Sequence, residues 1–568
     1  MHRMICLLVL CGFLWAPIGV RDADAQAVPD PAEMRAAVAS LTESERHPLL
    51  RWPDITRYVG VLKEASGADP DGLFWFENGR PHRALAGAIQ GLGQAHEQGI
   101  DPAEFDAQTL TSHWQRFQVG RSAPAADWAA FDTAVSVAVA RYLSSVHQGR
   151  VDPRVVGFDY DLTARRLDPL ATLRSARDGE GGLPAAVGGV KPQFPVYERL
   201  VGALARYRQL ASAGEAPAVP ALTGAAKKVQ PGQSWAGSTA LAARLHAVGD
   251  LAAGASVPPS VGGVPVYSGA LVDAVKRFQE RHALEADGVI GPGTIAALNV
   301  SMARRVRQIE LALERERWLP EMRRGPYLFV NVPLFRLWAF DPDRPDEPLR
   351  MNVVVGKSVG HATPIFMDEM EYVIFRPYWN PPPSIVRSEI VPKARRDPAY
   401  LERENLEIVA GGSPAAASLP PTPANLDNVL KGKLTIRQKP GPKNALGLAK
   451  FIFPNAENVY MHGTPAQQLF SRARRDFSHG CIRLEDPARL AEWVLRNDPQ
   501  WTRERIVAAM NGAAPTQVNL KERLRVILFY DTAYVDSQGV VHFADDYYGH
   551  DAKLEAALAH GFPYPRTR

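Results

Sequence analysis

The chain has 568 residues, enough for about three to four domains of typical size. It is 46% hydrophobic and 22% charged, which excludes wholesale disorder and a protein that crosses a membrane many times. The 65 Lys and Arg residues are nearly balanced by 61 Asp and Glu residues. A net charge of +4 over this length, with no basic run to compensate, argues against a nucleic-acid partner.

Residues 1–25 have the pattern of a secretory signal peptide. Arg3 supplies a positive start, residues 4–20 are apolar, and a small-residue step ends at Ala25, where we expect cleavage. A retained membrane anchor is the less favoured alternative, because the apolar stretch is short and contains Pro17. We therefore expect a periplasmic protein that touches the membrane only if this segment stays uncleaved.

The position of the cysteines directs attention to a single thiol. Cys6 and Cys11 lie within the predicted signal segment, so the mature chain would keep only Cys481. A lone thiol cannot form an internal disulfide. In an oxidising compartment such a residue is a candidate for chemistry.

Residues 26–228 are predicted to form a helical scaffold domain. The segment is rich in Ala, Leu and Arg, and apolar residues such as Leu85, Ile89 and Leu92 recur at helical spacing. A linker-like stretch at 211–224 closes the region. Its residues indicate no role beyond scaffolding.

Residues 229–300 are predicted to form a small helical unit, with Leu271, Val275 and Phe278 on one face of a helix. The stretch AVKRFQERHALEADGVIGPGTIAALN closely resembles the small three-helix peptidoglycan-binding domain. The resemblance implies glycan as a partner. The alternative is that the unit only packs against its neighbours.

Beyond residue 325 the sequence pattern changes from helical to β-rich. We expect a linking helix within 301–325, then a mostly-β domain over 326–500 with β-rich runs separated by turn clusters. Residues 376–447 interrupt these runs with a long, irregular, Pro-rich stretch, which predicts an inserted lid. Residues 501–568 are predicted to form a helix and a hairpin around the turn Asp-Ser-Gln-Gly.

Two short motifs carry the chemistry: Tyr460-Met-His-Gly-Thr-Pro and Ser478-His-Gly-Cys-Ile-Arg. A cysteine nucleophile needs a nearby imidazole to take its proton, and the imidazole needs an acceptor on its other nitrogen. The attacked carbonyl needs N–H donors, which a glycine-containing turn can supply. His462 and Cys481 fit these needs, although sequence alone cannot show that they meet.

The motif SHGCIR preceded by HGTP resembles the signature of the L,D-transpeptidase (YkuD-type) catalytic domain. The segments 317–320, 375–393, 440–455 and 525–543 resemble the larger, multi-domain periplasmic branch of that family. In that branch a helical scaffold precedes a peptidoglycan-binding domain, and the catalytic sheet carries a capping insertion. The resemblance thus implies a multi-domain protein with α-helical parts and a mostly-β catalytic domain.

The resemblance also implies residue roles. Cys481 would be the nucleophile and His462 the general base and acid, oriented by the carbonyl of Gly463. Backbone N–H groups around Gly480 and Cys481 would form the oxyanion hole. Supporting roles would fall to Ser478, His479 and Arg483.

Several alternatives stay open at these positions. His479, next to the nucleophile, could be the base in place of His462, and Arg483 could be an ordinary structural cation. Tyr460, Trp379 and Asn380 could line the groove or simply pack. No metal or cofactor is expected, because the histidines show no ligand spacing. No S-x-x-K or G-x-S-x-G motif supports a serine acyltransferase.

The implied reaction is transfer of an acyl group between peptidoglycan stem peptides, with the Cys481 thiolate attacking a tetrapeptide donor and releasing D-alanine. The acceptor would be the side-chain amine of a diamino acid on a neighbouring stem. Water as acceptor would make the protein a carboxypeptidase or hydrolase, and a non-catalytic peptidoglycan-binding scaffold is the alternative of a different class. The resemblance adds that carbapenems should acylate Cys481, whose pKa we expect His462 to lower toward neutrality.

Overall fold

A computed structural model describes residues 29–118, 123–223, 227–252, 254–255, 260–320, 325–344, 348–413 and 415–564. The predicted signal segment lies outside these residues. Within them, no helix is both long and apolar enough to cross a membrane. The described residues fall into two compact units, one formed by those within 29–93, 102–141 and 169–186 and the other by the remaining described residues.

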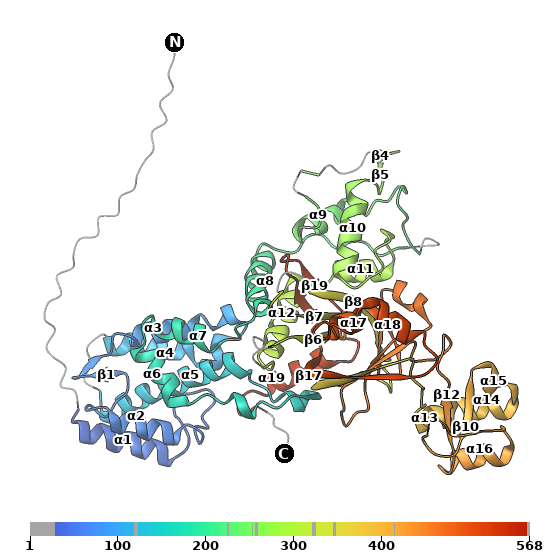
Figure 1. Ribbon diagram of the computed structural model, residues 1–568. Coiled ribbons are helices and arrows are strands. Elements are labelled where there is room, and N and C mark those ends of the chain that lie inside the picture. Colours follow the sequence, from blue (N-terminus) through green and yellow to red (C-terminus); the bar gives the residue numbers. More distant parts are fainter. Residues whose placement is uncertain are drawn as a thin grey trace. The chain divides into compact units, whose positions relative to one another are not determined.

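The first unit is helical, as its composition predicts. Its helices are α1 (Pro31–Glu43), α2 (Val59–Ala68), α3 (Leu85–Gly93), α4 (Ala107–Gln118), α6 (Pro169–Asp178) and the part of α5 (Ala125–Gln148) up to Arg141 (Figure 1). A buried carboxylate ties two of its segments together, because Asp132 of α5 accepts hydrogen bonds from the N–H groups of Phe74 and Trp75 at 3.0 and 2.6 Å. Burial raises the pKa of Asp132 to about 7.

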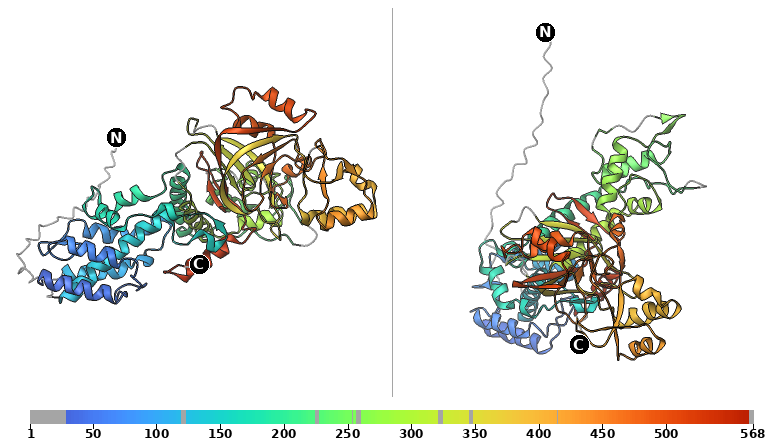
Figure 2. Two further views of the ribbon diagram at one scale, coloured as in Figure 1. Left: turned by 60° about the horizontal axis from the view of Figure 1, so that its bottom comes forward. Right: turned by 45° about the vertical axis from the view of Figure 1, so that its right-hand side comes forward.

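The second unit is built around a sheet that closes on itself. Its strands run in the order β13-β14-β16-β8-β7-β6-β17-β9, and β9 pairs again with β13. The bounds are β6 (Tyr327–Asn331), β7 (Arg336–Phe340), β8 (Leu349–Gly356), β9 (Ile365–Phe375), β13 (Ala449–Ile452), β14 (Met461–His462), β16 (Ile482–Leu484) and β17 (Thr516–Phe529). The barrel-like curl is visible in the left view of Figure 2. The mostly-β expectation for this region is confirmed.

Segments from both ends of the unit complete this sheet. β17 lies between β6 and β9, so residues beyond 501 are part of the same sheet as residues 326–500. β3 (Phe158–Asp159), from the predicted scaffold, pairs with β9. The expected hairpin forms from β18 (Ala533–Val535) and β19 (Val541–Phe543).

The helix before the sheet, α12 (Met302–Glu316), ends in buried charged side chains, two of which form ion pairs. Glu314 accepts hydrogen bonds from the backbone of Val151 and pairs with Arg317 at 3.1 Å. Arg315 pairs with Asp551 of α19 (His550–His560) at 2.7 Å. These contacts connect the end of α12 to Val151 and to α19, and breaking an ion pair would leave a buried charge without a partner. Glu316, the last residue of the helix, is buried without an ion pair among the described residues, and burial raises its pKa to about 8.

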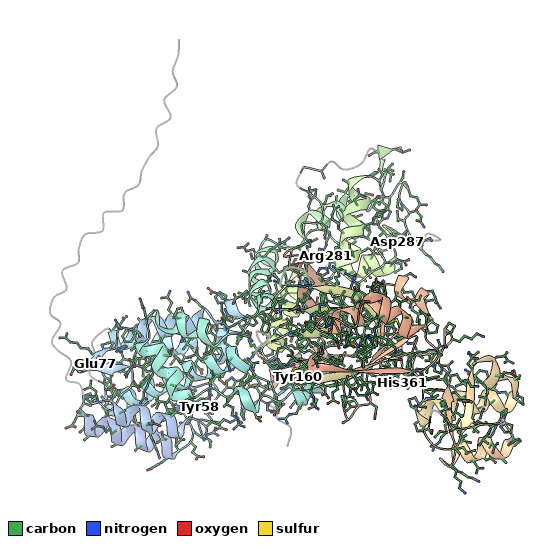
Figure 3. All side chains as sticks on the ribbon, viewed as in Figure 1. Tyr58, Glu77, Tyr160, Arg281, Asp287 and His361 are labelled. Carbon is green, nitrogen blue, oxygen red and sulfur yellow. The ribbon has the colours of Figure 1, made fainter. Side chains whose placement is uncertain are left out.

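The small unit predicted at 229–300 contains α9 (Ser238–Ala247), α10 (Ala270–Arg281) and α11 (Pro292–Leu298) around its own core. The predicted stripe Leu271, Val275 and Phe278 is buried there. Arg281 and Asp287, labelled in Figure 3, belong to this unit. At its border His282 stacks on Phe543 of β19, with ring centroids 5.7 Å apart.

Residues 376–447 are not irregular, and that expectation is wrong. They form a small α/β unit with the helices α14 (Val391–Arg396), α15 (Ala399–Arg403) and α16 (Pro423–Leu430) and the three-stranded sheet β11-β10-β12 (Figure 1). The strands are β10 (Leu406–Val409), β11 (Ser418–Leu419) and β12 (Thr435–Gln438). Ile390, Ile408 and Leu426 belong to a core of its own, separate from that of the large sheet. Elements this short are too brief for periodicity to reveal.

Candidate active site

Strand register brings the two sequence motifs side by side. Met461 of β14 pairs with Ile482 of β16, and His462 pairs with Arg483. Met461 and Ile482 are both fully buried in the sheet's core. Because side chains alternate along a strand, His462 and Arg483 point to the opposite face. Cys481 immediately precedes Ile482, so it lies at the N-terminal end of β16.

A third strand adds a residue that the sequence reasoning missed. Lys450 of β13 is the direct antiparallel partner of His462. Directly opposed residues project from the same face of a sheet, so Lys450, His462 and Arg483 form a row across three neighbouring strands. The only hint in the sequence is a lysine within the apolar run LAKFIF.

The Cys481 thiol is surrounded by groups from the segment before β14. Its Sγ lies 4.0 Å from the carbonyl oxygen of Asn458. The backbone N–H and the hydroxyl of Tyr460 both hydrogen-bond the sulfur and, with Lys450 and Arg483, lower the pKa of the thiol. Burial outweighs them and raises that pKa above its ordinary value. The expectation of a lowered cysteine pKa is therefore not met in this structure, because the sulfur is largely removed from water.

His462 is held in one tautomer. Its Nδ1 lies 2.5 Å from the carbonyl oxygen of Gly463. A carbonyl can only accept, so Nδ1 carries the proton and the lone pair is on Nε2. Burial, together with Arg483 and Lys450, lowers the pKa of His462 to about 3, so the imidazole is neutral near pH 7. The resting pair is thus a thiol and a neutral imidazole.

The turn before Cys481 is fixed by hydroxyl groups. Ser478 Oγ donates to the carbonyl of Cys481 at 2.5 Å and accepts from Gly480 N–H at 3.1 Å. Gly480 has a φ of +114°, which only glycine adopts without strain. Thr363 Oγ1 donates to the Gly480 carbonyl at 2.8 Å, and Tyr548 hydrogen-bonds the backbone N–H of Thr363 at 3.3 Å. Neither Thr363 nor Tyr548 carries a signal in the sequence.

His479 faces the inserted unit. Its Nε2 lies 3.3 Å from Glu389 Oε1, and its ring centroid is 4.7 Å from that of His361. Figure 3 labels His361 on the side of the sheet where the insertion leaves it. Burial lowers the pKa of His479, and Glu389 acts in the opposite direction. The contact with Glu389 ties the ring to the insertion, and the contact with His361 ties it to the loop between β8 and β9.

The three candidates for lining the groove, Tyr460, Trp379 and Asn380, lie in different surroundings. Tyr460 lies at the thiol, as described. Trp379 pairs through its backbone with Gln438 at 3.1 and 2.7 Å and packs on the core of the inserted unit. Asn380, the next residue, is exposed. The structure brings Tyr460 to the Cys481 thiol and packs Trp379 against the core of the inserted unit.

Comparisons with known proteins agree with this arrangement. Residues 325–506 match the family described as "L,D-transpeptidase catalytic domain", residues 70–204 a "Scaffold domain", and residues 239–298 a "Putative peptidoglycan binding domain". The chain therefore carries an L,D-transpeptidase catalytic domain and a domain of the peptidoglycan-binding type, as the resemblance implied.

One curated relative sharpens the comparison. A protein of Haemophilus influenzae named "Putative L,D-transpeptidase" is 28% identical over 251 residues, which is 44% of this chain. The match covers 49% of the relative, so the chain spans about half the length of the curated protein it matches.

Proposed function

We propose that this protein is a peptidoglycan L,D-transpeptidase that works through a Cys481 acyl-enzyme. The observation that carries the proposal is the register that sets His462 beside Arg483, and so beside the turn that holds Cys481. The match of residues 325–506 to the L,D-transpeptidase catalytic domain supports it.

The first half-reaction begins from the neutral pair. Nε2 of His462 takes the proton of the Cys481 thiol as the sulfur attacks the carbonyl carbon of residue three in a tetrapeptide stem. The Gly463 carbonyl, already bonded to Nδ1–H, stabilises the imidazolium that forms. The imidazolium then protonates the leaving nitrogen, D-alanine departs, and a thioester remains on Cys481.

The second half-reaction reverses the proton movement. The side-chain amine of a diamino acid on a neighbouring stem attacks the thioester carbonyl and gives its proton to Nε2 of His462. The new amide forms as the thiolate leaves, and the imidazolium returns its proton to sulfur. Water in place of the amine would give the hydrolase outcome.

The oxyanion of each tetrahedral intermediate needs donors near the sulfur. Gly480 N–H is engaged by Ser478 Oγ, so it could serve only if that contact opens. The Cys481 backbone N–H, next along the turn, is the better placed of the two amides that we expected to act. Ser478 then acts by holding the turn, through its bond to the Cys481 carbonyl.

The other parts of the chain are consistent with an enzyme that acts on peptidoglycan outside the cytoplasm. We propose that residues 376–447 cap the groove and limit water, which favours amine over water as acceptor. The unit at 229–300 would hold glycan, in line with its family match. The predicted signal segment would export the protein to the periplasm.

Product analysis tests the reaction. The purified mature protein is incubated with tetrapeptide-bearing muropeptides and the products are weighed by mass spectrometry. We expect cross-linked dimers together with free D-alanine. Shortened monomers alone would assign the hydrolase reaction, and unchanged substrate would leave only the scaffold alternative.

A further inference from the structure

Two cations beside Cys481 have no acidic partner other than the thiol. Lys450 and Arg483 form no ion pair with a carboxylate within the described residues, where the ion pairs of other Lys and Arg side chains are seen. For both side chains, the Cys481 thiol is the acidic group that acts on them. Nε of Arg483 is buried and has no hydrogen-bond partner.

Removing a charge from water without a counter-charge is costly, so two partly buried cations without a carboxylate partner are an unusual arrangement. The structure holds both cations in place. Register fixes Lys450 and Arg483 on either side of His462, and the Lys450 ammonium lies 3.9 Å from the centre of the Tyr460 ring. Burial lowers the pKa of both cations, and the Cys481 thiol, which acts in the opposite direction, only partly offsets that effect.

We propose that Lys450 and Arg483 form a carboxylate-binding subsite that holds the donor stem peptide against the Cys481 thiol. A carboxylate is the anion that such stems offer, and a guanidinium and an ammonium are the usual partners for it. This deepens the proposed function, because the donor is the one named there. Two carboxylates of the donor stem could occupy the subsite: that of the terminal D-alanine and that on the side chain of the diamino acid.

The same cations also favour the thiolate, so loss of turnover in a variant would not distinguish the two roles. A ratio of two alkylation rates does. Iodoacetate and iodoacetamide both require the thiolate of Cys481, so the thiolate fraction cancels, and only iodoacetate carries the carboxylate. The rates are followed on the full chain by the mass of the peptide that contains Cys481.

We expect the iodoacetate-to-iodoacetamide ratio at Cys481 to exceed that of a cysteine in a short peptide. Lys450→Gln and Arg483→Gln should each lower the ratio by about tenfold, the size of one charge-assisted hydrogen bond. Lys450→Arg, which keeps the charge, should retain most of it. Lys443→Gln is the matched control, because this exposed lysine of the insertion bonds the Arg403 carbonyl. A thermal melt of each variant reports whether it is folded.

A ratio that stays the same in folded Lys450→Gln and Arg483→Gln would overturn the subsite and leave the cations with thiolate activation only. Two donors then identify the carboxylate, one amidated at the terminal D-alanine and one at the diamino acid. A rise of about tenfold in KM for one of them assigns it. Unchanged KM for both would refute a donor role. The alkylation ratio could fall in Lys450→Gln and Arg483→Gln while the wild-type protein turns over no tetrapeptide. That result would support the carboxylate subsite and refute the proposed transpeptidase reaction.

Discussion

The row Lys450–His462–Arg483 and the inserted unit 376–447 lie next to each other but are held in opposite ways. The row is fixed by strand register within a closed sheet, on the face opposite to the core residues Met461 and Ile482. The insertion has a separate core and touches the turn before Cys481 through Glu389 and His479, both partly exposed. The contact is an ion pair only when His479 is protonated, and burial lowers the pKa of His479. It therefore contributes little near neutral pH and can open at small cost.

This difference in how the two regions are held suits them to different proposed tasks. Proton transfer needs atoms placed within a fraction of an ångström, which a closed sheet supplies. Under the proposed function the insertion would admit a polymer and exclude water, which needs a part that moves, and a weakly held unit would allow such movement. The two regions should therefore respond differently to mutation: the row in the rate of reaction, the insertion in the distribution of products.

The largest expected effect is at the nucleophile. Cys481→Ser keeps nearly the same shape but supplies an alcohol that His462 would activate poorly, so turnover should fall by ~1,000-fold or more with an unchanged melting temperature. His462→Ala should behave alike. Intact mass spectrometry should show one carbapenem added to the wild type and none to Cys481→Ser. Cross-linking by a folded Cys481→Ser would contradict the mechanism.

The pH dependence of Cys481 alkylation tests whether Cys481 and His462 rest as a thiol and a neutral imidazole. A raised thiol pKa means that the thiolate fraction, and with it the rate of iodoacetamide alkylation, rises about tenfold per pH unit past neutrality. The plateau should lie above the ordinary thiol pKa of 9.0. Because the His462 pKa is about 3, its protonation should add no step between about pH 5 and 8. A plateau near neutrality would instead indicate a thiolate–imidazolium pair.

Excision of the insertion should change products more than rate. Trp379 and Gln438 are paired by two backbone hydrogen bonds, so residues 380–437 can be replaced by a short Gly/Ser turn. This cut leaves Leu446 and Gly447, which pack beside Gly463, in place. The sheet should stay folded, while product should shift from cross-linked dimer toward hydrolysed monomer. An unchanged dimer yield in the excised protein would disprove the lid.

The smallest expected effect is at the exposed contact. Glu389→Gln removes the carboxylate that favours the His479 imidazolium, so the pKa of His479 should move lower still. The NMR titration of its ring reports this directly, and the dimer-to-monomer ratio should fall about two- to fivefold. Glu402→Gln, an exposed glutamate on α15 of the same unit, is the matched control and should change neither. Equal effects of both variants would show that the bridge has no special role.

The sequence was sufficient where a few residues act through their own chemistry. The Ser-His-Gly-Cys and His-Gly-Thr-Pro motifs specify a thiol, a base and a glycine turn, and the apolar stripe of 229–300 specifies a small helical core. These signals are local and need no knowledge of distant partners.

The tertiary structure decided what depends on residues far apart in the chain. Lys450 becomes a neighbour of His462 only through antiparallel register, and Thr363 reaches Gly480 only because the loop after β8 folds over the turn. The direction of the Cys481 pKa shift depends on burial, which no motif records. The insertion looked irregular because its helices and strands are short, and their order comes from packing on one another rather than from periodicity.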